Sequence, residues 1–213
     1  MIHLQKTAPT PTAYRIETDR LLLRCWSPTD ARILRDCLDD NDQHLRPWIP
    51  FMKDEPRNLE QTAEWLRTMR AGFDLRQNYR FAVLNRAGEK LLGENMLLGR
   101  AGPGAFEIGY WMDRHATGKG YASEATCAMI RVAFEVERVG RVEIMCEPEN
   151  NASAAIPAKL GFTHDATLPK RVANLEGKIC DLMVWSLFAD DYQATPAAGM
   201  EMRAFDCLGN PII

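Results

Sequence analysis

Short apolar segments along the chain predict a protein built around one β-sheet. These segments are strand-sized and rich in leucine, isoleucine, valine and aromatic residues. They span residues 21–26, 79–84, 91–99, 106–112, 142–146, 162–168 and 182–188. Turn-forming sequences at residues 85–88 and 102–104 separate three of the middle strands, which is typical of an antiparallel meander.

Other segments repeat their apolar residues at helical spacing. They predict helices at residues 28–38, 58–73, 118–133 and 154–160. Ser27 and Pro28 suit the N-cap and the first turn of the first helix. The order of elements predicts an α+β (mixed α/β) fold, with a central twisted, mostly antiparallel sheet of about seven strands flanked by about four helices.

The chain length predicts one domain with extensions, because 213 residues exceed a typical domain only moderately. We expect an N-terminal leader at residues 1–14 and the domain itself at residues 15–192. The remaining tail, residues 193–213, either adds a hairpin near residues 200–207 or stays partly loose.

Composition and charge argue against several classes of protein. The chain has 26 Lys and Arg against 29 Asp and Glu, a net charge of −3, whereas dedicated nucleic-acid binders usually carry a basic surface. The N-terminus lacks the apolar region of a secretory signal, and no stretch has the roughly 18–20 apolar residues that span a bilayer. We therefore expect a cytoplasmic protein without membrane contact. The six cysteines and four histidines lack metal-ligand spacing, so we expect reduced thiols and no metal.

The segment from Asp113 to Ala125 carries the most chemical information. Gly118 and Gly120 flank Lys119 where a predicted strand gives way to a predicted helix. The N–H groups at a helix start attract anions, and glycine lets a bulky ligand approach the backbone. The segment is therefore suited to phosphate groups, although such a glycine pair can also form a plain strand-to-helix turn.

This segment resembles the acyl-CoA-binding motif of the GNAT N-acetyltransferase superfamily, Gln/Arg-x-x-Gly-x-Gly/Ala. The six positions read Thr117, Gly118, Lys119, Gly120, Tyr121 and Ala122. Thr117 departs from the usual Gln or Arg, whereas Gly120 and Ala122 keep the small residues. Residues 149–153 and 158–162 are similar to a second block of the family, Asn-x-x-Ser followed by Lys-Leu-Gly-Phe.

Residues 16–24, 45–50 and 107–112 resemble the Rim-type branch of this superfamily, which acetylates the N-termini of ribosomal proteins. The resemblance implies the GNAT fold, in which splayed strands form the acyl-CoA cleft. It also implies acetyl-CoA as co-substrate and a primary amine as acceptor, most naturally a protein or peptide N-terminal α-amine.

The resemblance assigns residues to the acetyl-CoA site. The backbone of Tyr110, Trp111 and Met112 would bond the pantetheine amides, and Asn150 would bond the pantetheine arm from the other side. The motif at residues 117–122 would hold the pyrophosphate on its backbone amides. The alternative for Trp111 and Met112 is core packing.

Two residues are candidates for the proton transfers of the reaction. Glu107 would be the base, directly or through water, although it can instead be a surface carboxylate in a cross-strand pair. Ser153 would be the acid near the sulfur, and its alternative role is the N-cap of the short helix. Many family members carry a tyrosine acid four residues later, where this chain has Pro157. Proline cannot donate a proton, so the acid role falls to Ser153, to solvent or to no group. If Ser153 caps the helix, Pro157 also leaves the Ser153 carbonyl without its helical N–H partner.

The acceptor can be narrowed by its ionisation. An α-amine with a pKa near 8 is roughly a tenth neutral at pH 7, against under about one in a thousand for lysine. A site with a weak base and no tyrosine acid therefore suits an α-amine, or another amine of low pKa, better than lysine. Trp48 and Phe51, in a proline-rich loop, would wall the acceptor pocket or else cover the first helix. A small-molecule amine acceptor (antibiotic, toxin or polyamine), a non-catalytic acyl-CoA-binding regulator and a homodimer remain open.

Overall fold

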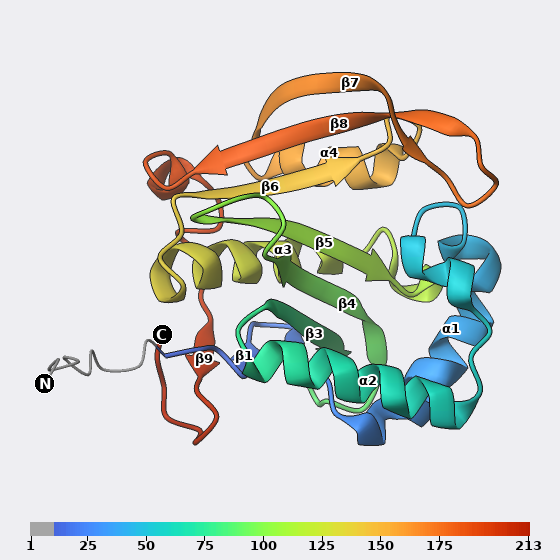
Figure 1. Ribbon diagram of the computed structural model, residues 1–213. Helices are drawn as coiled ribbons and strands as arrows, with labels where there is room; N and C mark the ends of the chain where they lie inside the picture. Colours follow the sequence, from blue (N-terminus) through green and yellow to red (C-terminus); the bar gives the residue numbers. More distant parts are fainter. Residues whose placement is uncertain (1–10) are drawn as a thin grey trace, which may run out of the picture.

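A nine-stranded sheet forms the centre of the computed structural model, which describes residues 11–213 (Figure 1). Its order is β7-β8-β6-β5-β4-β3-β2-β1-β9, and neighbours are antiparallel except for β5 and β6. The strands are β1 Arg15–Glu17, β2 Leu21–Cys25, β3 Asn78–Asn85, β4 Leu91–Leu98, β5 Ala105–Met112, β6 Arg141–Cys146, β7 Thr163–Ala173, β8 Ile179–Phe188 and β9 Arg203–Phe205. The expected fold class is confirmed. Within residues 11–213 the sheet gains two strands, β1 and β9, which at three residues each are too short to show an alternating pattern.

Helices cover both faces of this sheet. They are α1 Ala31–Leu45, α2 Leu59–Asp74, α3 Tyr121–Arg131 and α4 Asn151–Lys159. Figure 1 shows α1 and α2 on one face, and α3 and α4 on the other. Each face has its own core, because successive strand residues point to opposite sides. In β3, for example, Phe81 and Val83 belong to the core under α3, whereas Ala82 and Leu84 belong to the core under α1 and α2.

The helix starts follow the capping chemistry of the sequence. Ser27 caps a short 3-10 turn, Pro28–Asp30, that leads into α1. The Asn58 side chain accepts a hydrogen bond from the Gln61 backbone N–H at 2.8 Å, and the Gln61 side chain accepts one from the Asn58 backbone N–H at 2.9 Å. The first helix continues to Leu45, whereas the apolar pattern predicted its end near residue 38. The pattern missed the last turns because the next buried position of the helix is the polar Asn41.

The parallel pair β5 and β6 separates along its length. The two strands pair only from Ala105 with Arg141 to Glu107 with Glu143. Beyond that point β5 stays paired with β4 as far as Met112, while β6 stays paired with β8 as far as Cys146. A gap therefore opens inside the sheet, and the expected splayed strands are confirmed.

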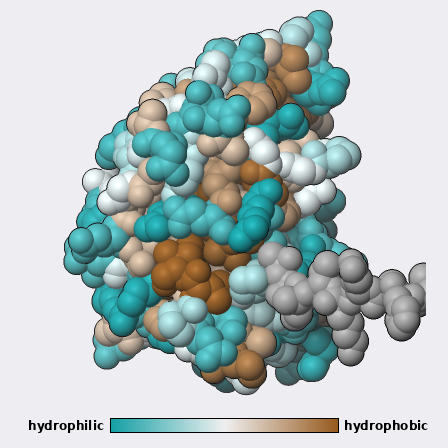
Figure 2. All heavy atoms as spheres, turned by 90° about the vertical axis from the view of Figure 1, so that its left-hand side faces the viewer, coloured by the Kyte–Doolittle hydropathy of each residue, from teal (hydrophilic) through white to brown (hydrophobic). Residues whose placement is uncertain are grey.

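The chain after residue 192 returns to the far edge of the sheet. β9 pairs with β1, and the Ile212 backbone donates to the Ala204 carbonyl at 2.8 Å. β9 lies within the expected hairpin region, residues 200–207, but the segment that folds back on it lies beyond that region, near Ile212. On this side of the molecule a compact apolar area lies among hydrophilic side chains (Figure 2). Of the expected leader, residues 1–10 lie outside the described residues, and Tyr14 donates its backbone N–H to the Phe205 carbonyl at 2.8 Å. Within residues 11–213, none of the helices combines the length and the apolar character that a membrane span requires.

Candidate active site

The connection from β5 to α3 carries the glycine motif at the open end of the splayed strands. Gly118 and Gly120 have φ values of +72° and +79°, in the left-handed region that favours glycine. A Cβ at Gly118 would meet no atom within 4 Å, and one at Gly120 would meet only Arg20 at 3.4 Å. Backbone conformation, rather than lack of space in the protein, therefore requires these glycines. Gly120 is the N-cap of α3, so the first N–H groups of this helix lack helical partners.

Two side chains from distant elements hold this connection in place. Asn41 of α1 is 1% exposed, accepts from the Arg114 backbone at 2.7 Å and donates to Asp113 at 3.2 Å. Arg20, between β1 and β2, donates to the Lys119 carbonyl at 2.9 Å and to Glu124 of α3 at 2.6 Å. The sequence patterns gave neither residue a role, because each lies about 70 or more positions from the segment that it supports.

A cavity of about 420 Å³, here called the α3 cavity, lies between the glycine motif, the end of β5 and α4. Its lining includes Tyr110, Trp111, Met112, Thr117, Gly118, Gly120, Tyr121, Ala122, Asn150 and Ser153. All of the residues expected at the acetyl-CoA site thus line this cavity, except Lys119. The Lys119 side chain is exposed outside it. Lys159 of α4 also lines the cavity and was not expected from the sequence.

The side chain of Trp111 is also a core residue. It is buried on the opposite face of the sheet, and its indole N–H donates to Glu94 at 2.9 Å. Glu94, which is 2% exposed, accepts further hydrogen bonds from Trp26 at 2.8 Å and from Arg80 at 2.6 and 2.8 Å. Core packing therefore holds for this side chain. The backbone role of residues 110–112 toward pantetheine stays a prediction.

A second cavity of about 690 Å³, here called the sheet cavity, lies on the face that α1 and α2 cover. The walls are Trp48, Phe51, Arg80, Arg100, Glu107, Cys146, Glu147 and Leu175, among others. Both aromatic residues expected at an acceptor pocket are thus present. Phe51 also packs against Trp65 and Trp111, at ring-centroid distances of 5.0 and 6.4 Å, so it is part of the core cover as well.

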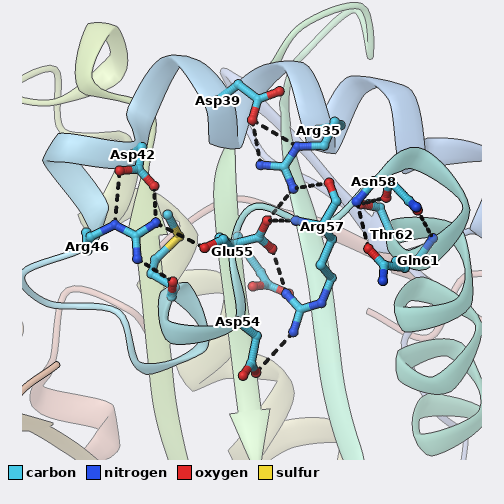
Figure 3. A network of polar contacts seen from close by, with 12 residues as sticks. Arg35, Asp39, Asp42, Arg46, Asp54, Glu55, Arg57, Asn58, Gln61 and Thr62 are labelled. Carbon is cyan, nitrogen blue, oxygen red and sulfur yellow. Dashed lines mark hydrogen bonds and ion pairs between the residues drawn. The ribbon is translucent and has the colours of Figure 1, made fainter.

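An ionic network fixes the loop that carries these two aromatic residues (Figure 3). Glu55, whose side chain is 1% exposed, pairs with both Arg35 and Arg57. Arg46 donates to the Met52 carbonyl at 2.8 Å. The loop is thereby tied to α1 at one end and to the start of α2 at the other. This wall of the sheet cavity is pre-formed.

The two cavities meet where β5 and β6 have separated. They share five lining residues, which are Trp48, Ile49, Tyr110, Asn150 and Ser153. A molecule bound in the α3 cavity can therefore reach a molecule bound in the sheet cavity through the gap in the sheet. Such an arrangement suits transfer of a group between two substrates.

Glu107 lies in the sheet cavity, close to the point where the strands separate. It is 6% exposed and accepts from Arg100 Nε at 2.6 Å and Arg100 Nη2 at 2.5 Å. It is thus a buried carboxylate rather than a surface one. The hydrogen bonds to Glu107 raise the pKa of Arg100. Because each carboxylate oxygen has a second acceptor site, Glu107 can still accept a hydrogen bond from a water or an amine.

Glu147 is a second carboxylate on the wall of the sheet cavity, and the sequence patterns did not single it out. It is half-buried and follows β6 directly. Arg80 and Arg100, the arginines on this wall, pair with Glu94 and Glu107. Among residues 11–213, no lysine or arginine pairs with Glu147. Within this part of the chain Glu147 therefore forms no ion pair, although the Cys180 thiol hydrogen-bonds to it and Lys178 interacts with its charge at longer range.

Ser153 stands at the junction of the two cavities, in the first turn of α4. Its backbone N–H donates to the Asn150 side chain at 3.1 Å, so Asn150 is the N-cap of this helix. The alternative that Ser153 itself caps the helix is wrong. The Tyr110 hydroxyl donates to the Ser153 carbonyl at 3.0 Å and lies 3.2 Å from the Ser153 hydroxyl.

Comparison with known proteins agrees with this geometry. The acetyltransferase (GNAT) domain matches residues 20–163. A putative ribosomal N-acetyltransferase of Bacillus subtilis (strain 168), YdaF, is 27% identical over 182 residues, covering 82% of this chain and 94% of the relative. The ribosomal protein uS5-alanine N-acetyltransferase of Escherichia coli (strain K12) is 26% identical over 183 residues, covering 84% of this chain and 92% of the relative.

The fold is also that of solved acetyltransferases. The structure of RimL, a ribosomal L7/L12 α-N-protein acetyltransferase in complex with coenzyme A, superposes with a TM-score of 0.74 at 18% sequence identity. The match covers 80% of this chain and 95% of that one. Because the family match spans more than half of its length, the chain belongs to the GNAT acetyltransferase family and is an acyl-CoA acetyltransferase.

Proposed function

We propose that this acetyltransferase transfers the acetyl group of acetyl-CoA to the N-terminal α-amine of a protein or peptide. The observation that carries the proposal is the pair of cavities meeting at the gap between β5 and β6. One cavity offers backbone groups to a long anionic ligand, and the other offers carboxylates to an amine. The ribosomal-protein N-acetyltransferases among the relatives support the same class of acceptor.

Acetyl-CoA fits the α3 cavity by the chemistry of its wall. The amides of residues 118–122 and the positive end of the α3 dipole suit a pyrophosphate. The edge of β5 at residues 110–112 offers peptide groups to the pantetheine amides, with Asn150 opposite. In this arrangement the thioester lies beside Ser153, at the junction with the sheet cavity.

The acceptor amine enters the sheet cavity as an ammonium ion and must lose a proton before it attacks. The unpaired charge of Glu147 attracts the ammonium ion, and Glu107 lies at the gap where the attack occurs. We propose Glu107 as the base, acting directly or through water, and Glu147 as the group that binds the ammonium ion. The loop with Trp48 and Phe51 packs against the first residues of the acceptor.

Two negative charges develop during the catalytic step, first on the carbonyl oxygen and then on sulfur, and the site must stabilise both. The neutral amine attacks the thioester carbonyl, the C–N bond forms, and the C–S bond electrons leave on sulfur. Backbone N–H groups of β5 stabilise the oxyanion, and Ser153 meets the departing thiolate. The amine proton passes to Glu107 or its water, and the products are the N-acetyl acceptor and CoA.

A thiol-release assay tests the acceptor class. The substrates are short peptides with a free N-terminus, the same peptides with a blocked N-terminus and an internal lysine, and small amines including polyamines and aminoglycosides. We expect turnover of the free N-terminal peptides alone. Turnover restricted to small amines would replace the peptide acceptor, and acetyl-CoA binding without any turnover would favour a regulator.

A further inference from the structure

Helix α4 has an orphaned acceptor in its first turn. In a regular helix the carbonyl of Ser153 would accept from the backbone N–H of residue 157, four positions later. That residue is Pro157, which has no N–H. A carbonyl left unsatisfied in a half-buried position costs free energy, so another donor is needed.

Tyr110 supplies this donor from a different element. Its side chain projects from β5 into the gap, and its hydroxyl donates to the Ser153 carbonyl at 3.0 Å. The same hydroxyl lies 3.2 Å from Ser153 Oγ. Because the single phenolic proton goes to the carbonyl, the phenol oxygen is free to accept from the serine hydroxyl. Tyr110 thus contacts Ser153 twice and lines both cavities.

We propose that Tyr110 is the positioning residue for Ser153, holding the serine hydroxyl at the cavity junction so that it can donate to the sulfur of the leaving group. The inference rests on the proposed function and adds how the hydroxyl of Ser153 is oriented toward the leaving sulfur. Without the phenol, the serine hydroxyl would be free to turn toward a carbonyl of the preceding helical turn, a common alternative for serine in helices.

The proposed step involves no change of oxidation state and no proton transfer from Tyr110. When the C–S bond breaks, its electron pair stays on sulfur, and the serine hydroxyl turns from the phenol oxygen to the thiolate. The thiolate later takes a proton from solvent and leaves as the CoA thiol. Tyr110 keeps its proton throughout, since burial raises the pKa of its hydroxyl.

Other ionisable groups surround Ser153. Cys146 of β6 is a second hydrogen-bond partner of the Ser153 side chain; burial raises the pKa of its thiol, and the bond to Ser153 partly offsets that rise. The remaining groups that line the two cavities are His44, Arg80, Arg100, Glu107, Tyr121, Glu147 and Lys159. A test based on pH must separate the CoA thiol from these groups.

The test compares the affinities of CoA and acetyl-CoA by calorimetry between pH 7 and pH 9.5. Free CoA carries an alkanethiol that ionises at alkaline pH, whereas acetyl-CoA has no ionisable thiol. A donor at the sulfur stabilises the thiolate, so we expect the CoA to acetyl-CoA affinity ratio of the wild type to rise about tenfold over this range. Protein groups that have the same pKa in both complexes cancel in the ratio, and the variants separate the groups close to the sulfur.

The variants assign the rise to the Tyr110 and Ser153 pair. In Ser153→Ala and in Tyr110→Phe the CoA to acetyl-CoA affinity ratio should stay constant with pH. In Cys146→Ala the ratio should still rise with pH. Pro157→Ala restores a backbone N–H to the Ser153 carbonyl. In the Tyr110→Phe, Pro157→Ala double variant we therefore expect recovered thermal stability and a ratio that stays flat. Recovery of the rise in this double variant would mean that Tyr110 only satisfies the carbonyl, and would overturn the proposal.

Kinetics give the second readout once an acceptor amine is known. Tyr110→Phe should lower kcat about tenfold with acetyl-CoA affinity kept, as expected for one lost hydrogen bond. In a Ser153→Ala background it should have no further effect, because it acts through the serine. Additive losses, or a wild-type pH rise in Tyr110→Phe, would refute the positioning role. The binding test needs no acceptor, so it remains decisive even if the α-amine proposal fails.

Discussion

The two cavities meet at the same gap, but one is lined mainly by backbone groups and the other mainly by side chains. The α3 cavity presents mainly backbone, with two glycines of positive φ at the start of a helix. The sheet cavity presents mainly side chains from several strands and the loop with Trp48 and Phe51. The surface of the first cavity is set by backbone conformation, which Asn41 and Arg20 support from outside, whereas that of the second is set by side-chain ion pairs such as Arg100 with Glu107.

This difference decides what each cavity can recognise. Backbone amides offer the same donors whatever the surrounding side chains are, so the α3 cavity suits a ligand common to the whole family. Side chains can be exchanged without changing the fold, so the sheet cavity is where acceptor choice resides. The comparison predicts that binding of acetyl-CoA responds to conformational changes, and that turnover of the amine responds to changes of side-chain charge.

The largest effect is expected at Gly120. Gly120→Glu puts a carboxylate at the helix start and a side chain on a residue with φ of +79°. Acetyl-CoA affinity should fall by about 100-fold or more, since charge repulsion and backbone strain both oppose binding. Calorimetry checks the result. Gly120→Ala isolates the strain and should bind with intermediate affinity. Unchanged affinity in Gly120→Glu would remove the pyrophosphate site.

Substitution of the two carboxylates tests the sheet cavity. Glu107→Gln should lower kcat about 100-fold with acetyl-CoA affinity kept, the typical contribution of a general base. Glu147→Gln should chiefly raise KM for the peptide acceptor, because it removes the unpaired charge that attracts the ammonium ion. Steady-state kinetics with a free N-terminal peptide separates the two patterns. The reverse assignment, with the kcat loss in Glu147→Gln, would make Glu147 the base.

The same contrast explains how far the sequence could predict this molecule. The motif at residues 117–122 is local, and five of its six residues line the α3 cavity. The contact between Tyr110 and Ser153 spans 43 positions, and that between Asn41 and Arg114 spans 73. No periodicity encodes such contacts. The strands β1 and β9 were not predicted for a related reason. Each has three residues, and so short a segment forms a strand only because the rest of the sheet is in place to pair with it.

A smaller effect is expected from the support of the glycine motif. Arg20→Met removes the hydrogen bonds to the Lys119 carbonyl and Glu124 and the stacking on Tyr121. Acetyl-CoA affinity should fall about three- to tenfold, with KM for the acceptor unchanged. Arg15→Met is a matched control, because Arg15 is 42% exposed against 43% for Arg20, pairs with Glu17 and stacks on Phe205. Equal losses in both variants would point to general destabilisation.

The smallest effect is expected at Lys119, although it lies between the two glycines of the motif. Its side chain is exposed and does not line the α3 cavity, so it acts on the pyrophosphate only through solvent. Lys119→Ala should weaken acetyl-CoA binding about twofold at low salt, and less at 0.5 M salt. Lys159→Ala, from the cavity wall, should have the larger effect. A loss at Lys119 that rivals Gly120→Glu would mean that charge, rather than backbone, builds the α3 cavity.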